Sequence, residues 1–402
     1  GALPVSAPLA NILAIPWVTF LTVPLSLVAT ALLTFSSDSG GQVLQWAAST
    51  LDMLWPVLEG IQALIPVYSM NSDVAIWAVI AAIFGCMMLL LPQGIPGRWL
   101  GLIWILPIFW SNSQKLSLGE VSLTLLDVGQ GLSVIVETRN HVMIYDTGAK
   151  FSQRFDSASA AVLPFLRYRN LNKVDTLVLS HDDIDHVGSA DTLLAGIAVE
   201  QIVSSYTADI NTTDINHANQ TNKVACVRGQ TWSWDKVLFE VLHPPASIYL
   251  GMGQDNNQSC VIRISANGSR ILLTGDIESV VEKMLVNENA DTALLKADLL
   301  VVPHHGSASS SSEAFLDQVE PRIAVASTGY RNRYGFPKPH VVERYLQRGI
   351  EFVTTAEKGA MTYIVGNKSI DAAPDNNAKG QKMSIYLNHA MRLDNKRFWY
   401  SR

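Results

Sequence analysis

The chain has 402 residues, 48% of them hydrophobic, with 29 basic and 35 acidic side chains. This length favours more than one domain, and the positive mean hydropathy excludes a single ordinary soluble domain. Residues 1–114 contain one basic residue, Arg98, and four acidic ones, so almost all of the charge lies downstream. We therefore expect a membrane part followed by a water-soluble part of nearly neutral charge.

The membrane part begins at Gly1, inside an apolar region that no charged stretch precedes. This excludes a signal peptide, so we expect the C-terminal part of a longer membrane protein. Residues 16–34 and 74–91 are uncharged and about as long as a bilayer span. Residues 99–110 are shorter, apolar and rich in tryptophan, which favours the membrane interface.

Residues 41–65 carry apolar side chains at helical spacing with polar ones between them. They predict an amphipathic helix that lies on the membrane or packs against a neighbouring helix. Orientation follows from the positive-inside rule, because Arg98 lies in a loop without acids whereas residues 35–73 carry only acids. The rule predicts that everything after residue 111 lies outside the cytoplasm.

The soluble part alternates short apolar stretches with turns and helical patterns. The predicted strands are 121–127, 132–138, 141–146, 174–180, 237–242, 260–265, 270–275, 298–303 and 322–327. The predicted helices are 157–169, 188–197, 277–287, 311–319 and 339–348. This alternation indicates an α/β sandwich of layered sheets, and the polar residues 367–383 predict a loop.

A dense cluster of histidine and aspartate follows one predicted strand. Its metal-type ligands form the pattern H-x-D-x-D-H and are His181, Asp183, Asp185 and His186. Aspartates are common in turns, but the two flanking histidines argue against a plain solvated turn. A calcium loop is excluded because Leu194 stands where that loop needs a bidentate glutamate.

Three more strand ends carry candidate ligands, namely Asp276, the pair His304 and His305, and Asp146. Each one alone could cap a turn or a helix. Together they share one geometry, polar groups at strand ends, which predicts a dinuclear metal site. Asp276 is suited to bridge two ions, and Asp146 to orient the site from behind its ligands.

The motifs together resemble the ComEC family of competence proteins. They are H-x-D-x-D-H (181–186), GD (275–276), HHGS (304–307), DTG (146–148), DVGQG (127–131) and NNQSC (256–260). The upstream text LPVSAPLANILAIPWVTF is similar to the end of that family's transmembrane competence domain. The resemblance implies an αββα sandwich of the metallo-β-lactamase type in a multi-pass protein of the cytoplasmic membrane. It divides the chain into a competence domain (1–114), a metallo-β-lactamase-like domain (115–370) and a tail (371–402).

The resemblance also implies DNA uptake across the cytoplasmic membrane during natural transformation. The soluble domain, on the periplasmic or extracellular side, is then a metal-dependent nuclease that cleaves the DNA strand left outside. The implied partners are single-stranded DNA, membrane lipid and other DNA-uptake proteins. The alternatives are a hydrolase of small esters or phosphodiesters, and an inactive domain that binds DNA or a partner. Basic residues such as Arg331 and Arg333 in a groove beside the metals would favour the nuclease.

The resemblance assigns the ligands residue by residue. They are His181 and Asp183 for one ion, Asp185 and His186 for the second, Asp276 as the bridge, and His305 as a further ligand of the second ion. Asp183 stands where the commoner superfamily motif has histidine, and a carboxylate there hardens the site. We therefore expect two divalent metal ions, with Mn²⁺ favoured and Zn²⁺ or Mg²⁺ as alternatives. The expected catalytic residues are Asp183, Asp185 and His304, with His304 facing a substrate phosphate.

Further residues are expected behind the ligands or against the substrate, namely Asp127, Asp146, His243, Asn256 and Lys338. Asp127 belongs to the glycine-rich turn DVGQG, and for Asn256 a turn role fits equally well. The family often has histidines where Phe336 and Lys338 stand. We therefore expect a lost proton donor there, unless the charge of Lys338 replaces it.

Two of the three cysteines, Cys226 and Cys260, fall in the soluble part. A disulfide between them would persist outside the cytoplasm. Two unpaired buried thiols fit the sequence equally well.

Overall fold

The structure is a computed structural model, and it describes residues 2–3, 7–64, 68–69, 76–92, 94–109, 115–153, 155–205, 221–247, 256–289, 293–366 and 385–391. The predicted loop 367–383 lies outside these described residues. The chain divides into two compact units. The first is Gly1–Ser113 with Arg167–Asn170, and the second is Gln114–Leu166 with Leu171–Arg402.

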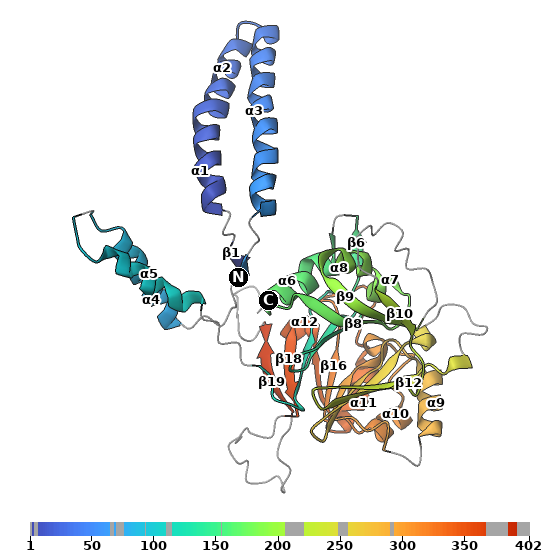
Figure 1. Cartoon of the computed structure of the whole chain (residues 1–402). Coiled ribbons are helices and arrows are strands. Elements are labelled where there is room, and N and C mark those ends of the chain that lie inside the picture. Colours follow the sequence, from blue (N-terminus) through green and yellow to red (C-terminus); the bar gives the residue numbers. More distant parts are fainter. Residues whose placement is uncertain are drawn as a thin grey trace. The chain divides into compact units, whose positions relative to one another are not determined.

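The first unit opens with a helical hairpin (blue in Figure 1). Its first arm consists of α1 (Ala7–Trp17), the π-helical turn η1 (Val18–Thr22) and α2 (Val23–Leu33). This arm, Ala7–Leu33, is long and apolar enough to cross a membrane. It starts earlier than the predicted span 16–34, because the chain stays helical through Pro16 and widens to π spacing directly after it.

The second arm is α3 (Ser37–Leu64), which runs beside α2. The Thr22 and Thr50 hydroxyls are 2.7 Å apart, and the Trp17 indole N–H donates to the Thr50 carbonyl at 3.0 Å. Of the two alternatives for the helix predicted at 41–65, these contacts favour packing on a neighbouring helix. Large apolar side chains of this helix, such as Trp46 and Trp55, remain exposed.

A second helical pair follows, made of α4 (Ile76–Leu89) and the segment η2 (Arg98–Leu100), α5 (Gly101–Ile105) and η3 (Leu106–Phe109). The pair meets at two glycines, since a Cβ on Gly85 would lie 2.4 Å from the Gly101 carbonyl oxygen. α4, with 14 residues, is shorter than the span predicted at 74–91, whereas the segment Arg98–Phe109 is as long as the stretch predicted at 99–110. Among the described residues, the arm Ala7–Leu33 alone meets both the length and the hydropathy of a membrane span.

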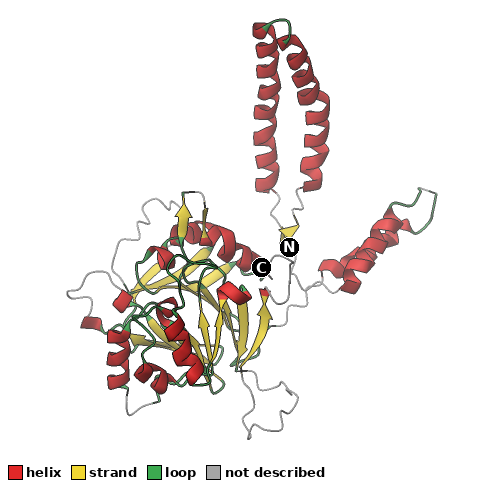
Figure 2. Cartoon of the chain, turned by 180° about the vertical axis from the view of Figure 1, so that it is seen from behind, coloured by secondary structure: helices red, strands yellow, loops and turns green. Residues whose placement is uncertain are grey.

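Two sheets form the second unit (Figure 2). The first has the order β10 (Asn222–Ala225), β9 (Ala198–Ser204), β8 (Lys173–Leu179), β5 (Val142–Tyr145), β4 (Val134–Glu137), β3 (Val121–Leu125), β18 (Met361–Val365) and β19 (Ile385–Ala390). The second has the order β11 (Thr231–Trp234), β12 (Val237–His243), β13 (Val261–Ala266), β14 (Ser269–Leu273), β15 (Leu299–Val301), β16 (Ile323–Ala326) and β17 (Glu351–Thr354). Two short pairs stand apart, β1 (Ala2–Leu3) with β2 (Tyr68–Ser69), and β6 (Lys150–Ser152) with β7 (Phe155–Asp156).

Helices cover the outer face of each sheet. They are η4 (Ala158–Val162), α6 (Leu163–Tyr168) and α8 (Ala190–Gly196) on the first sheet, and α9 (Ser279–Glu288), α10 (Glu313–Val319) and α11 (Pro339–Gln347) on the second. Shorter elements are α7 (Ile184–Val187), η7 (Asn256–Gln258), η8 (Pro303–Gly306) and α12 (Thr355–Lys358).

The side-chain alternation along the strands builds these layers. Met143 and Tyr145 of β5 point into the space between the sheets, whereas Ile144 packs against the helices of the first sheet. In the second sheet Leu299 faces the inter-sheet core, and Leu300 faces the helices. The resulting order, helices–sheet–sheet–helices, confirms the predicted αββα sandwich. All nine predicted strands and all five predicted helices of this unit are present, with ends shifted by a few residues.

Parallel pairing decides where the strand-end residues meet. β5 runs parallel to β8, and β14 runs parallel to β15 and, through it, to β16. The carboxyl ends of parallel strands lie at one edge of a sheet. The polar residues that follow each of these strands are therefore collected at that edge.

Candidate metal centre

The first sheet contributes two residues to the site, each just after the end of a strand. Asp146 follows β5, and His181 lies two residues beyond β8. Asp146 has a left-handed backbone (φ 59°) and is completely buried. Its carboxylate accepts from the backbone N–H and the hydroxyl of Ser180, both at 2.7 Å. Asp146 thereby joins the ends of β5 and β8.

The same carboxylate orients the first ligand candidate. Nδ1 of His186 lies 2.7 Å from the Asp146 carboxylate. With its proton on Nδ1, His186 keeps Nε2 free to act as a ligand. This nitrogen lies 3.2 Å from a carboxylate oxygen of Asp276, which belongs to the second sheet.

The second sheet contributes Asp276 after β14 and the two histidines after β15. His304 and His305 both have left-handed backbones (φ 48° and 54°), an uncommon and strained conformation for two successive non-glycine residues. Nδ1 of His305 donates to the Ser327 carbonyl at 2.8 Å. Its Nε2 lies 3.4 Å from the carboxylates of Asp185 and Asp276.

Two groups of metal-type ligand atoms result, each with all atoms within 4.8 Å of one another. One group is His181, His186 and Asp276, and the other is Asp185, His186 and His305. Both groups contain His186. They therefore differ from the expected assignment, in which His181 and Asp183 hold one ion and Asp185 and His186 hold the other. Asp183 is in neither group. Its carboxylate lies 3.6 Å from Nε2 of His181, and its side chain is 54% exposed.

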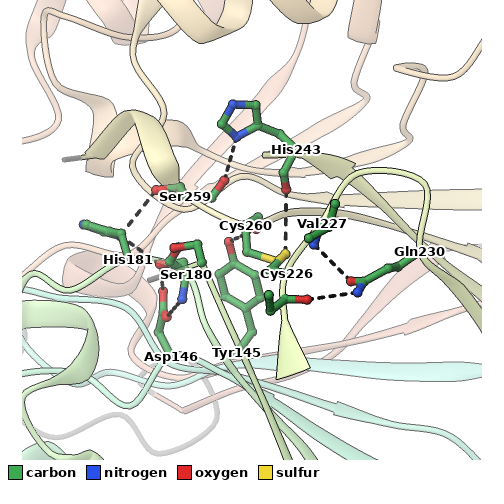
Figure 3. The surroundings of a disulfide bond; sticks show 12 residues. Tyr145, Asp146, Ser180, His181, Cys226, Val227, Gln230, His243, Ser259 and Cys260 are labelled. Atoms are coloured by element: carbon green, nitrogen blue, oxygen red, sulfur yellow. Dashed lines mark hydrogen bonds between the residues drawn. A yellow bond between two sulfur atoms is a disulfide. The ribbon is translucent and has the colours of Figure 1, made fainter. Parts of the chain in front are cut away.

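His181 carries a buried nitrogen that makes no hydrogen bond. Its Nδ1 is 2.9 Å from the Ser180 hydroxyl and 3.3 Å from the Ser259 hydroxyl (Figure 3). Its Nε2 makes no hydrogen bond, although the residue is only 1% exposed. A buried polar atom without a hydrogen bond is costly in a folded protein, and coordination of a metal ion would satisfy this nitrogen.

The charges of the site point the same way. Burial alone would raise the pKa of Asp276, but His186 and His305 hold that pKa well below its usual range. Burial would lower the pKa of His186, and the carboxylates of Asp276 and Asp146 outweigh it and raise that pKa well above the usual value. Among the described residues, no lysine or arginine forms an ion pair with Asp183, Asp185 or Asp276. The donor set therefore fits divalent cations, which would neutralise these carboxylates.

The remaining predicted residues surround this centre at different depths. His304 reaches Asp276 at 3.8 Å and Glu278 at 3.6 Å, so it borders the ligands. Asn256 contributes its carbonyl, which accepts from the backbone N–H and the hydroxyl of Ser259. Asp127 lies partly buried in the turn that follows β3. Lys338 donates to the Tyr334 carbonyl at 2.8 Å, in a loop beside the histidines.

His243 lies outside both ligand groups. Its Nδ1 donates to the Ser259 carbonyl at 3.0 Å, on the side of Ser259 away from His181 in Figure 3. Burial lowers the pKa of His243 to about 4, so the imidazole is neutral at ordinary pH.

Residues that the sequence did not single out support the ligands through hydrogen bonds. They are Ser180, Ser259 and Ser327. The hydroxyl of Ser259 accepts from the backbone N–H of Asp276 at 3.0 Å. It also lies 3.3 Å from Nδ1 of His181, and this contact links the second sheet to the first. Ser327 follows β16, so the rule that found Asp146 and Asp276, a polar residue at a strand end, would have found it too.

A disulfide joins Cys226 to Cys260 behind the centre, with Cα atoms 6.0 Å apart (Figure 3). Of the two alternatives for these cysteines, the structure has the bridge. Cys260 directly follows Ser259, its N–H donates to the Ser180 carbonyl at 2.9 Å, and its carbonyl accepts from the Tyr145 hydroxyl at 2.6 Å. The bridge is therefore attached to the segment that supports His181 and Asp276.

Comparisons with known proteins agree with this geometry. Residues 126–330 match the metallo-beta-lactamase superfamily, and residues 1–94 match the competence protein family. The chain therefore belongs to the metallo-β-lactamase superfamily, and its soluble domain is of the metal-dependent hydrolase type. The pairing of that domain with a competence domain makes the chain a ComEC-family protein.

Named relatives share both parts. The chain is 31% identical to competence protein ComA of Neisseria gonorrhoeae over 390 residues, which are 96% of this chain and 50% of that protein. It is 27% identical to ComE operon protein 3 of Bacillus subtilis, over 90% of this chain and 49% of that protein. The chain thus spans about half the length of these relatives. Among solved structures, the metallo-beta-lactamase fold protein YhfI of Bacillus subtilis aligns over 58% of this chain and 95% of that one, with 12% identity and a TM-score of 0.39.

Proposed function

We propose that the second unit is a dinuclear metal-dependent nuclease that cleaves phosphodiester bonds of single-stranded DNA during DNA uptake. The observation that carries the proposal is the convergence, from the strand ends of both sheets, of five side chains: His181, Asp185, His186, Asp276 and His305. The match to the competence family supplies the link to DNA. The DNA strand left outside the cell is the proposed substrate.

The proposed ligands are the six expected from the sequence: His181, Asp183, Asp185, His186, Asp276 and His305. Divalent ions held there would lower the pKa of water and stabilise negative charge on phosphoryl oxygens. Because carboxylates are numerous and Asp183 replaces a histidine, Mn²⁺ is favoured over Zn²⁺ and Mg²⁺.

The chain's own residues orient the reactants. Asp146 fixes the ring of His186 through the hydrogen bond to Nδ1, and the Ser327 carbonyl does the same for His305. Asp183 is the most exposed acid of the motif and can accept a proton from the attacking water. His304, at the edge of the ligand set, faces a substrate phosphate.

The competence match and the apolar helix Ala7–Leu33 support membrane association. We propose a multi-pass protein of the cytoplasmic membrane, with the competence domain at 1–114, the nuclease domain at 115–370 and the tail at 371–402. The Cys226–Cys260 bridge supports a periplasmic or extracellular location of the nuclease domain, since disulfides persist in oxidising compartments. Membrane lipid and other DNA-uptake proteins are the proposed partners.

The test uses the full chain in detergent with end-labelled single-stranded DNA and Mn²⁺. Asp276→Ala removes a ligand of the second sheet that lies 3.2 Å from His186 of the first. Asp317→Ala removes an exposed aspartate of α10, which pairs with Arg348, and is the matched control. We expect the wild type and Asp317→Ala to degrade the DNA and Asp276→Ala to lose the activity. Equal breakdown by all three proteins, or by none, would overturn the nuclease proposal. Hydrolysis of a small phosphodiester without DNA breakdown would favour the alternative of a small-substrate hydrolase.

A further inference from the structure

A surface loop beside the metal centre, residues 329–338, is held firmly at both ends. At its start, a Cβ on Gly329 would lie 2.9 Å from the backbone nitrogen of Gln130, so the backbones pass in close contact. At its end, the N–H of Lys338 donates to the Gly306 carbonyl at 2.9 Å, directly after His305. The loop is thus attached to the segment that supplies a metal ligand.

The interior of the loop is ordered around one side chain. The Asn332 amide donates to the carbonyls of Gly329 and Phe336, at 3.1 and 2.6 Å. Its amide oxygen accepts from the N–H of Phe336 at 2.9 Å. These bonds fix the loop shape without using Tyr330 or Tyr334, which point outward with 59% and 44% exposure.

Aromatic rings lead from this loop to the metal centre. The rings of Tyr334 and Phe336 are stacked with centroids 5.6 Å apart and planes 18° apart. Phe336 continues to His305, with centroids 6.5 Å apart and planes 20° apart. Phe336 stands where histidine was expected from the family, and here it provides a flat apolar face between Tyr334 and a ligand.

The positive charges of the loop have no carboxylate partners among the residues that the structure describes. The Arg331 guanidinium lies 5.2 Å from the Tyr330 ring centre, and that of Arg333 lies 4.8 Å from the Tyr334 ring centre. Neither forms an ion pair among the described residues, and neither does Lys338. Some surface cations elsewhere in this unit, such as Lys296 with Glu320, do pair with acids. Unpaired cations interleaved with exposed rings are the features of sites that bind single-stranded nucleic acid.

We propose that loop 329–338 is a stacking platform for single-stranded DNA, in which Tyr330 and Tyr334 stack on bases while Arg331, Arg333 and Lys338 contact phosphates. This proposal rests on the proposed nuclease function and names how its substrate is held. The platform selects single strands because only unpaired bases offer their faces to the rings. It would deliver the backbone of the bound strand to His304 and the ligand set.

The test measures binding apart from cleavage. Fluorescent oligothymidylate of about 16 nucleotides is titrated with the full chain in excess EDTA, and anisotropy gives the dissociation constant. Tyr330→Ala/Tyr334→Ala should weaken binding about tenfold, because both stacking faces are lost. Tyr330→Phe/Tyr334→Phe should restore binding, because the rings remain. Lys296→Ala, at the opposite end of β15, should bind as the wild type does.

The charges give a second readout. Removing Arg331 and Arg333 together should reduce the slope of log affinity against log salt by about 0.7 per side chain. The tyrosine variants should leave that slope in place. Binding by the double alanine variant as tight as that of the phenylalanine variant would overturn the proposal. An equal loss for a DNA duplex would overturn it too, since a duplex cannot stack on the platform. Absence of DNA breakdown by the wild type in Mn²⁺ would overturn the nuclease function instead, because the binding measurement in EDTA does not depend on cleavage.

Discussion

Nδ1 of His186 lies 2.7 Å from the Asp146 carboxylate, and both side chains are fully buried. This pair connects the end of β5 to the metal-binding motif, and it fixes which nitrogen of His186 faces the ligand positions. An orienting carboxylate of this kind contributes to metal affinity without touching the metal.

Asp146→Asn should therefore weaken Mn²⁺ binding about 10- to 100-fold. The amide is a poorer acceptor than the carboxylate, and it leaves the His186 ring free to choose the other tautomer. Calorimetric titration of the apo full chain with Mn²⁺ measures the effect. Asp298→Asn is the control, because the Asp298 carboxylate also accepts from a backbone N–H, that of Arg270, but lies at the opposite end of β15. Equal affinities for Asp146→Asn and the wild type would show that His186 does not need this partner.

A substitution at Gly131 should also disturb the metal centre, because Gly131 contacts the H-x-D-x-D-H motif directly. A Cβ at Gly131, whose φ is 133°, would lie 2.3 Å from the Asp185 carbonyl oxygen, which also accepts from the N–H of Leu132 at 3.1 Å. Gly131→Ala should push the motif away and reduce metal-dependent hydrolysis at least tenfold. Gly268→Ala separates this displacement from backbone strain, since Gly268 also has positive φ (91°) but nothing within 4 Å. Its activity should stay close to that of the wild type, and a similar loss in both variants would contradict the contact argument.

The disulfide closes a loop across 34 positions, so it should stabilise the soluble unit by about 2–4 kcal/mol through the unfolded state. Cys226→Ser/Cys260→Ser should lower the midpoint of thermal unfolding, and reducing agent should lower that of the wild type equally. Cys86→Ser, which changes the free cysteine on α4, should leave the midpoint in place. No shift in the double variant would mean that the bridge does not stabilise the fold.

His243 predicts a dependence of stability on pH. The unfolded chain takes up a proton on this residue near pH 6.5, whereas burial lowers the folded pKa to about 4. Acidification from pH 6.5 to 4 therefore favours the unfolded state, and the contribution of His243 to stability, about 2–3 kcal/mol, is lost over that window. His243→Gln should lose less stability than the wild type between these pH values, as measured by thermal unfolding. Parallel pH curves for the two proteins would contradict the burial of a neutral imidazole.

The sequence could predict the centre of this fold because its strands are apolar runs that end in conspicuous polar residues. It did not yield β18, whose partner β3 lies far away in the chain. It did not yield β17 either, because the polar Glu351 and Thr354 stand at the ends of its four residues and leave no apolar run. β11 alternates outward Thr231 and Ser233 with Trp232 and Trp234, which pack on the inter-sheet core. That period of two was a usable signal for a strand.

The candidate site, like the fold, was only partly predictable from the sequence. Histidines and aspartates at strand ends were visible because their chemistry is distinctive. Ser180 and Ser259 were not, because a serine becomes part of the site only through the particular hydrogen bonds that the fold creates. The left-handed backbones of His304 and His305 are also set by tertiary contacts, since no local pattern favours that conformation in two successive histidines.

The metal content of the purified full chain tests the central claim most directly. After equilibration with Mn²⁺ and removal of the excess, elemental analysis should find about two Mn²⁺ per wild-type chain and a clear deficit in Asp276→Ala. Asp317→Ala should retain the wild-type content. A wild-type chain that holds no stoichiometric Mn²⁺, Zn²⁺ or Mg²⁺, or an Asp276→Ala chain with unchanged content, would contradict the dinuclear centre.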